Sequence, residues 1–255
     1  MDYPLVSCLT ATYGRPVVLG EAIKCFVDQD YPNKELIVLN DQEGVQLVIE
    51  NCPQNIHIVN YPKRFGSLGE KRNHMTTLAS GEFFCIWDDD DLYTPFRISD
   101  SIKYAYENPQ YDIYKAEDAI LCMNLADYKI ANNLFHSQAC IRKEYMSKNK
   151  YPNMSIGEDR DFEKHAKVYS AKIFPFIWYL YRWNSNLNIH HLSGLGDEKR
   201  SWDKALIFEP YSKLKGKVVV RPEFQKDYWA DVKVYMNNIN PAFGKLWYDK
   251  IGRKC

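Results

Sequence analysis

The order of apolar and amphipathic segments in the first sixty residues constrains the fold more than any other feature. Apolar runs that predict buried strands cover Leu5–Thr10, Glu35–Leu39 and Ile56–Val59. After the first run, Pro16 can open a helix, and apolar residues within Leu19–Val27 fall on one helical face. Strands and helices that alternate at this spacing form parallel βαβ units. We therefore predict an α/β fold with a mostly parallel sheet, whose site lies at the carboxyl ends of the strands.

Four consecutive aspartates, Asp88–Asp91, follow the apolar run Phe83–Trp87 and precede a helical pattern that begins after Pro95. They stand where a strand ends, and their like charges repel one another. A divalent cation with oxygen ligands, shared with phosphate groups, would offset that repulsion. The alternative is a solvated acidic loop. An EF-hand is a poor match, because Tyr93 stands where that loop needs glycine.

A basic pair lies at a predicted helix start. Ser67 and Glu70 have the spacing of a capping box, which starts a helix near Ser67. Lys71 and Arg72 then fall in the first turn, where cations oppose the helix dipole. The pair could face an anion such as a diphosphate, or it could be solvent-exposed surface charge.

Two further motifs lie in the second half of the chain. Ser155 and Glu158 repeat the capping-box spacing, so the acids here either stabilise a helix start or provide a general base such as Asp159. In the pair His190-His191, at most one imidazole should complete a metal shell, since adjacent side chains of an extended segment point apart.

Composition argues against several protein classes. Lys plus Arg and Asp plus Glu both total 33, without the basic excess typical of nucleic-acid binding. No apolar run of about 18 residues exists and no secretory signal precedes the first strand, so we expect neither a membrane-spanning helix nor export. Peripheral membrane contact through the Trp- and Tyr-rich C-terminal part stays open. Seven Cys without C-x-x-C pairs predict reduced thiols in a cytosolic protein. Phosphate-binding glycine motifs of P-loop and dinucleotide enzymes are missing.

Taken together, these motifs resemble the family 2 type of glycosyltransferases with a GT-A fold. The resemblance extends over about the first 190 residues. It rests on the segments Pro4–Tyr13, Val27–Asp41 and Gly69–Asn73, on the aspartate run followed by Pro95, and on Glu158-Asp159. The Q-x-x-R-W motif of processive synthases is absent, which argues for transfer of a single sugar.

The resemblance implies a fold and a set of site residues. The expected fold has a Rossmann-like nucleotide-binding half, with helices flanking the sheet, and a smaller mixed acceptor-side region. The residues implied for the nucleotide-sugar are Thr10, Thr12, Tyr13, Arg15, Asp41, Arg72, Asp88 and Asp89. Those implied for Mn²⁺ or Mg²⁺ are Asp90 first, then Asp88, Asp91 and His191. Asp159 matches the catalytic base of members that invert the anomeric centre.

The expected organisation is one domain over residues 1–255. Residues 1–110 would bind the nucleotide-sugar, 111–200 would carry the acceptor and catalytic half, and 201–255 would form a helical extension. The predicted enzyme moves a sugar from a UDP-sugar to a hydroxyl of a glycan, glycoprotein or glycolipid. One alternative is a sugar-phosphate nucleotidyltransferase, although its Gly-rich basic loop is poorly matched by Ala11–Pro16. The other is a non-catalytic carbohydrate-binding protein on the same fold.

Overall fold

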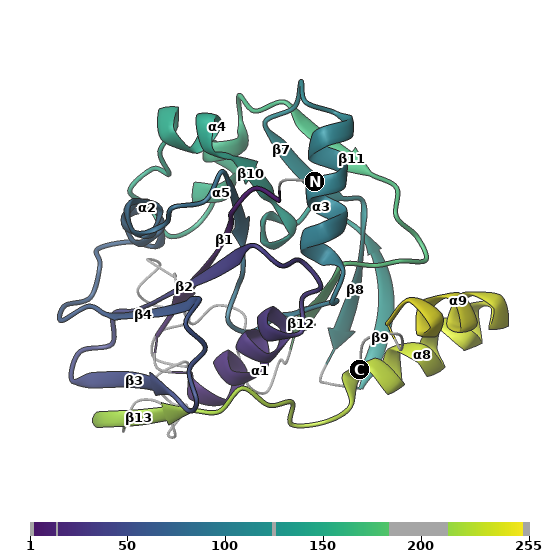
Figure 1. The fold of residues 1–255 in the computed structure, drawn as a ribbon, viewed down its shortest axis with the longest axis horizontal. Coiled ribbons are helices and arrows are strands. Elements are labelled where there is room, and N and C mark those ends of the chain that lie inside the picture. Colours follow the sequence, from purple (N-terminus) through teal and green to yellow (C-terminus); the bar gives the residue numbers. More distant parts are fainter. Residues whose placement is uncertain (1–2, 14, 124–125, 184–213, 252–255) are drawn as a thin grey trace.

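A seven-stranded sheet forms the centre of the protein. The computed structural model describes residues 3–13, 15–123, 126–183 and 214–251 (Figure 1). The sheet has the order β11-β7-β10-β5-β1-β2-β4. Its strands are β1 (Val6–Thr12), β2 (Lys34–Asn40), β4 (Ile56–Asn60), β5 (Phe83–Ile86), β7 (Ile113–Ala116), β10 (Cys140–Arg142) and β11 (Val168–Ala171). Only β10 runs antiparallel to its neighbours, so the predicted mostly parallel α/β sheet is confirmed.

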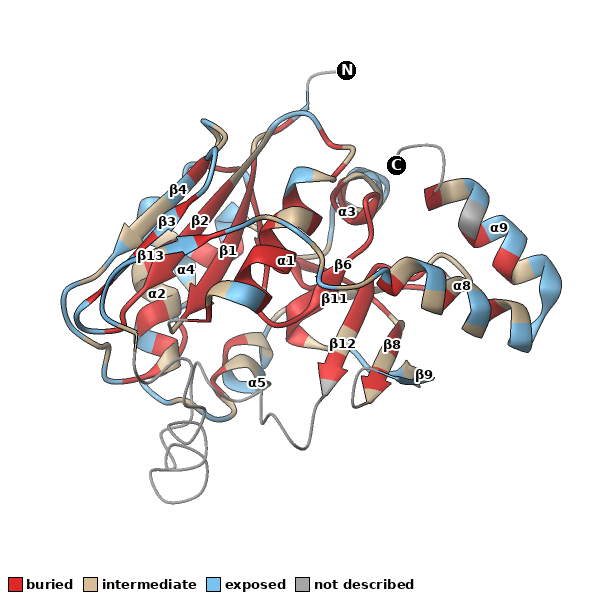
Figure 2. Ribbon diagram, turned by 90° about the horizontal axis from the view of Figure 1, so that it is seen from below, coloured by how far each residue is buried: buried red, intermediate tan, exposed pale blue. Residues whose placement is uncertain are grey.

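Helices cover both faces of this sheet. The helices α1 (Pro16–Val27) and α3 (Arg97–Glu107) pack on one face, and α2 (Leu68–Leu78), α4 (Lys143–Lys148) and α5 (Glu158–Glu163) pack on the other. Side chains of a strand alternate between the faces. In β1, residues 6 and 8 enter the first core and residues 9 and 11 enter the second. The inner strands β1 and β5 are therefore buried on both sides, as the red of β1 in Figure 2 shows.

A smaller mixed sheet continues the fold in the order β6-β12-β8-β9. Its strands are β6 (Leu92–Tyr93), β8 (Asp118–Met123), β9 (Asp127–Asn132) and β12 (Tyr179–Trp183). Further along the chain, β13 (Gly216–Val220) pairs in parallel with β3 (Val45–Ile49), and α8 (Tyr228–Ile239) and α9 (Pro241–Ile251) follow at the opposite end of the molecule (Figure 1). Within the described residues, no helix combines the length and the apolar character needed to cross a bilayer.

Two local predictions meet different outcomes. Ser67 is the N-cap of α2, and its Oγ accepts the backbone N–H of Glu70 at 3.1 Å, so this helix start is confirmed. The second predicted capping box is wrong. Gly157, with φ 77°, is the N-cap of α5. Ser155 instead accepts the backbone N–H of Leu68 at 3.0 Å, because α2 packs close enough to compete for its hydroxyl.

The strand β3 is absent from the sequence-based prediction. Its residues alternate between buried and exposed, as a half-buried strand requires. Its hydrogen-bonded partner, β13, lies about 170 residues further along the chain, where Gly216 pairs with Val45. A five-residue strand with so distant a partner gives only a weak local signal.

Candidate functional site

The carboxyl ends of β1, β2 and β5 form the floor of the candidate site. These strands are adjacent and parallel, so the residues that follow them meet at one edge of the sheet. Thr10 ties the edge together, since its hydroxyl donates to the carbonyl of Trp87 at 2.7 Å. Thr12 ends β1, Asp41 directly follows β2, and Asp88 begins the aspartate run shortly after β5. Thr10 and Thr12 are both fully buried.

Asp41 is held by a buried cation from α2. Lys71 Nζ donates to Asp41 Oδ1 and to the carbonyl of Thr12, both at 2.6 Å. The backbone N–H of Phe65 donates to Asp41 Oδ2 at 3.1 Å. Burial lowers the pKa of the Lys71 ammonium, and the Asp41 carboxylate opposes that shift. The anion that faces this cation is therefore a carboxylate of the protein itself.

Aromatic rings and a guanidinium lie in two loops near Asp41, one after β1 and one between β4 and α2. The Arg64 guanidinium carbon lies 4.6 Å from the centre of the Tyr13 ring. Phe65, whose N–H binds Asp41, stacks on Tyr61 with ring centres 4.5 Å apart. Flat groups of this kind can bind a planar ring by stacking.

Arg15 neutralises the middle of the aspartate run. It comes from the loop after β1 and is 1% exposed. Its guanidinium donates to Asp89 through Nε (3.1 Å) and Nη2, and to Asp90 Oδ2 at 2.8 Å through Nη1. Burial raises the pKa of Asp89 to about 6, although Arg15 acts in the opposite direction. The cation that offsets part of the run's repulsion is thus an arginine side chain.

Asp91 and Asp88 have separate partners. Asp91 accepts the hydroxyl of Tyr179 and the backbone N–H of Arg182, the latter at 2.8 Å. Burial, reinforced by the neighbouring aspartates, raises the pKa of Asp91 well above its usual value. Asp88 is the most open of the four, with 29% of its side chain exposed. It accepts the hydroxyl of Ser137 at 2.5 Å.

Arg72 joins the aspartate run to α5. Its Nη1 lies 2.7 Å from Glu158 Oε1, and its Nη2 lies 3.7 Å from Asp88 Oδ1. Burial alone would lower the pKa of Arg72, but Asp88, Glu158 and Asp159 contribute to raising it above its usual value. Asp159 itself is half-buried and accepts the N–H of Arg160 at 2.8 Å. Two carboxylates, Asp88 and Glu158, therefore flank one guanidinium.

Two partners of the site residues, Arg182 and Ser137, are not predicted by the sequence motifs. Arg182 donates from Nε to the carbonyl of Asp90 and from its backbone N–H to the Asp91 carboxylate, and its guanidinium also pairs with buried Glu21 of α1. A charge inside the aromatic segment Tyr179–Trp183 was a visible signal for it. Ser137 offers no comparable signal, since nothing local marks it. His191 lies outside the described residues.

The donor set suits a hard divalent cation. Asp88 and Asp90 have the D-x-D spacing; Asp88 is partly open to solvent, and Arg15 donates to Oδ2 of Asp90. In the part of the chain that the structure describes, no three His, Cys, Asp or Glu side chains form a complete metal shell. Mg²⁺ is typically held by one or two carboxylates and completed by substrate phosphates and water. The residues present therefore fit a cation shared with a diphosphate.

Comparison with known sequences decides the family. The family described as glycosyl transferase family 2 matches residues 7–174, which is more than half of the chain. The chain belongs to this family. An uncharacterized glycosyltransferase of Methanocaldococcus jannaschii is 29% identical over 44% of this chain and 41% of its own length. A GalNAc(5)-diNAcBac-PP-undecaprenol beta-1,3-glucosyltransferase of Campylobacter jejuni is 33% identical over 34% of this chain and 30% of its own. The matches thus span less than half of each relative.

Comparison with solved structures confirms the fold. TarS of S. aureus in complex with UDP-GlcNAc superposes with a TM-score of 0.56 and 14% sequence identity, over 92% of this chain and 66% of that one. At this identity the likeness concerns the fold alone. The family 2 protein therefore has the GT-A architecture that its motifs predict.

Proposed function

We propose that this family 2 protein is a single-sugar glycosyltransferase. It would move a sugar from a nucleoside-diphosphate sugar, preferably a UDP-sugar, to a hydroxyl of a glycan, glycoprotein or glycolipid. The observation that carries the proposal is the convergence of Asp41, the aspartate run and Arg72 at the carboxyl edge of one parallel sheet, where Arg72 also holds α5 through Glu158, the neighbour of Asp159. Ligands of open α/β sheets bind at such an edge. TarS, which shares the fold, binds UDP and UDP-GlcNAc.

The donor would lie across the ends of β1, β2 and β5. Asp41, which Lys71 and the N–H of Phe65 hold in position, would accept the N–H of a uracil base. Thr10, Thr12 and Tyr13 belong to the segment that borders the base. In this proposal residues 1–110 form the donor half, 111–200 the acceptor half and 201–255 the extension.

Breaking the bond to the anomeric carbon leaves negative charge on the diphosphate. Arg72 is the cation of the site that faces Asp88, and it would stabilise that charge. Asp90 and Asp88 would hold Mn²⁺ or Mg²⁺, which supplies Lewis-acid stabilisation of the leaving diphosphate. The other two aspartates anchor the run to the protein interior. Asp91 accepts the hydroxyl of Tyr179, and Asp89 accepts from Arg15.

Asp159 would take the proton of the acceptor hydroxyl. It lies half-buried at the start of α5, next to Glu158, which pairs with the same Arg72 that faces Asp88. A base on the face opposite the leaving group gives inversion of the anomeric centre, because the acceptor attacks as the diphosphate departs. The transition state has oxocarbenium character, as in glycoside hydrolysis.

Calorimetry with UDP, GDP and dTDP, each with Mn²⁺ and with EDTA, tests the donor assignment. We expect UDP to bind most tightly and only with the metal. Asp90→Asn should abolish metal-dependent binding while Asp127→Asn, an exposed aspartate on β9, should leave it unchanged. Metal-independent UDP binding in the parent, or undiminished binding in Asp90→Asn, would reject the metal assignment. A preference for GDP would reject the uracil assignment.

A further inference from the structure

The short turn η1 (His136–Gln138) touches both sides of the proposed site. Two adjacent side chains of this turn, His136 and Ser137, bind on opposite sides of the site. Ser137 donates to Asp88 Oδ2 at 2.5 Å, and His136 Nδ1 lies 2.5 Å from Glu163 Oε1 at the end of α5. One peptide unit therefore links the aspartate run, on the donor side, to the helix that carries Asp159.

The chemistry around His136 fixes its tautomer. A carboxylate can only accept, so Nδ1–H donates to Glu163, and the hydroxyl of Tyr151 donates to Nε2 at 2.9 Å. Burial lowers the pKa of His136, which keeps the imidazole neutral. Glu163 remains ionised, because His136 and buried Lys115 hold its pKa below the usual value against the effect of burial. The second Glu163 oxygen lies 2.6 Å from Lys115 Nζ.

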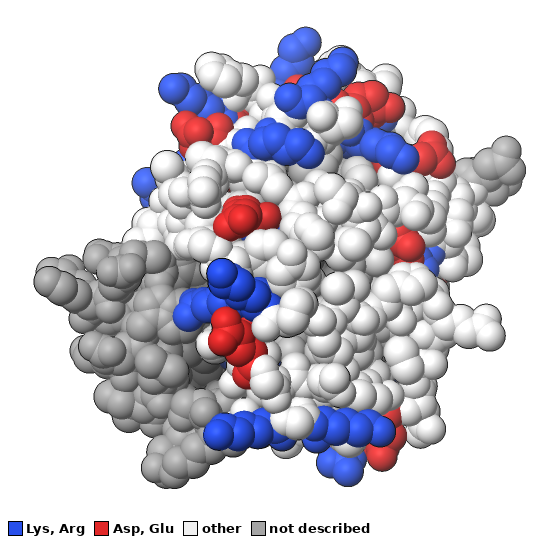
Figure 3. All heavy atoms as spheres, turned by 90° about the vertical axis from the view of Figure 1, so that its left-hand side faces the viewer, with Lys and Arg blue, Asp and Glu red and all other residues white. Residues whose placement is uncertain are grey.

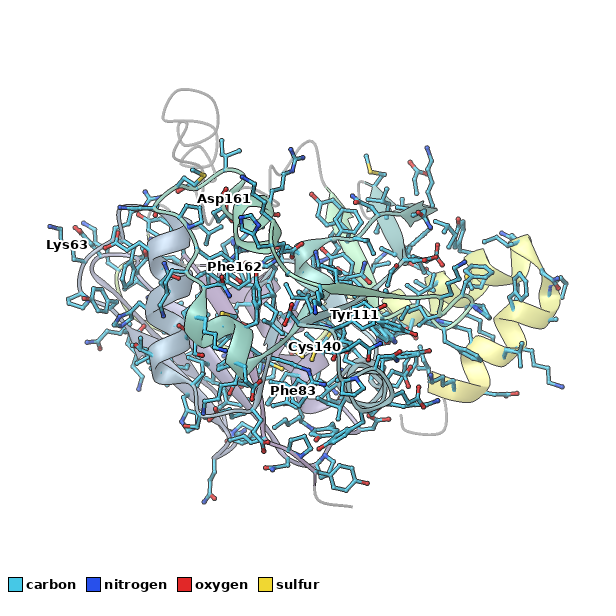
Figure 4. The ribbon with its side chains drawn as sticks, turned by 90° about the horizontal axis from the view of Figure 1, so that it is seen from above. Lys63, Phe83, Tyr111, Cys140, Asp161 and Phe162 are labelled. Atoms are coloured by element: carbon cyan, nitrogen blue, oxygen red, sulfur yellow. The ribbon has the colours of Figure 1, made fainter. Side chains whose placement is uncertain are left out.

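The helix α5 depends on such contacts for its position. It has six residues, and a helix this short has little stability of its own. Its first residue, Glu158, pairs with Arg72, and its last, Glu163, pairs with the turn. Between them, Phe162 stacks on Tyr151 with ring centres 4.0 Å apart. Figure 4 shows Phe162 beside its exposed neighbour Asp161.

We propose that His136 and Ser137 are positioning residues that set the place of Asp159 relative to the aspartate run. The inference rests on the proposed function, since it treats Asp159 as the base and Asp88 as a donor-side group. Neither residue touches the reacting atoms. Ser137 fixes the donor side, His136 fixes α5 through Glu163, and the turn keeps the two in register. A shift of about 1 Å between reacting groups can cost on the order of 10²-fold in rate.

The two residues should therefore affect different kinetic constants. The assay is UDP release from the UDP-sugar that binds in calorimetry. His136→Ala should lower kcat by about 10- to 100-fold with little change in the donor KM. Ser137→Ala should mainly raise the donor KM. His136→Asn, whose amide can replace the Nδ1–H donor, should recover much of kcat. His165→Asn, an exposed histidine just beyond α5, is the matched control and should behave as the parent.

Amide hydrogen exchange gives a readout that needs no substrate. His136→Ala should speed exchange across residues 158–163 several-fold, with His136→Asn and His165→Asn close to the parent. If His136→Ala and Ser137→Ala lower kcat and raise KM in parallel with their loss of stability, the turn is only structural and the inference fails. It also fails if exchange in 158–163 is unchanged.

The proposed function fails separately. If the parent protein binds no nucleoside diphosphate and releases no UDP from any UDP-sugar, the enzyme assignment is wrong whatever the exchange data show. If the parent is active and neither variant separates kcat from KM, the positioning inference alone is overturned.

Discussion

Replacing Lys71 by Met should destabilise the protein severely without creating a cavity. The two side chains have similar volumes, so the change removes the charge and little packing. Lys71 is 2% exposed, and its Nζ lies 2.6 Å from the Asp41 carboxylate. At an effective dielectric constant of about 20, two unit charges at that distance attract by about 6 kcal/mol. Part of this is offset because the ammonium no longer has to be desolvated. A net loss of about 3–5 kcal/mol is expected, as for other broken buried pairs.

Urea unfolding at pH 7 measures that loss, and a double-mutant cycle identifies its cause. Asp41→Asn alone leaves the buried Lys71 without a counter-charge and should also be destabilised. The double variant Lys71→Met/Asp41→Asn removes both charges, so it should be more stable than the sum of the single changes predicts. It should still fail to bind UDP, because Asp41 is missing. A loss below about 1 kcal/mol for Lys71→Met, or strict additivity in the cycle, would refute the reasoning.

The pH dependence of Asp41→Asn gives a further check on the same pair. Burial lowers the pKa of Lys71 in the folded protein below its ordinary 10.5, and Asp41 opposes that shift. Between the folded and unfolded pKa values the unfolded chain binds more protons, so stability rises with pH in that window. Without Asp41 the folded pKa falls further and the window widens. The free energy of unfolding that Asp41→Asn loses relative to the parent should therefore become smaller as the pH rises from about 7 to about 10. A loss that stays constant over this range would contradict this account.

Three further predictions follow from the described contacts. Asp159→Asn should reduce sugar transfer by about 10²–10⁴-fold while calorimetric UDP affinity stays within a few-fold; unchanged transfer, or a product with retained anomeric configuration, would reject the base. Because burial lowers the pKa of His136 below 6.5, the unfolded chain binds its proton first, and stability should fall as the pH drops below that value. His136→Asn should show a shallower fall in acid unfolding curves, and His165→Asn should not. Glu21→Ala removes the carboxylate that pairs with the buried guanidinium of Arg182 and should cost about 3–5 kcal/mol in urea unfolding; a loss near zero would show that the pair contributes nothing.

Short-range patterns in the sequence are enough to predict a mostly parallel α/β sheet and the edge at which the candidate site lies. The apolar runs of β1, β2, β4 and β5, and the helical pattern between the first two of them, can be recognised from a few neighbouring residues. The same holds for the N-cap Ser67, whose partner Glu70 is three residues away. The aspartate run directly after a predicted strand placed the candidate site at the carboxyl edge. The nucleotide, metal and base assignments remain predictions for the experiments above.

Which charges meet depends on the packing of distant segments. From the sequence, Arg15 could bind a nucleotide and Lys71 could bind a diphosphate, yet Arg15 pairs with Asp89 and Asp90, and Lys71 pairs with Asp41. These partners lie between 30 and 75 positions apart in the chain. A buried charge is costly unless it is paired, so its partner depends on which groups are desolvated together.

The same reason explains the elements that the sequence did not indicate. Strand β3 depends on β13, and the start of α5 depends on α2, because Ser155 Oγ accepts the backbone N–H of Leu68 and Gly157 is left as the N-cap. A side chain that could hydrogen-bond to its own neighbours can bind a distant donor instead once the chain is folded. Local spacing therefore predicts which residues could cap or pair, and only the packing of distant segments selects among them.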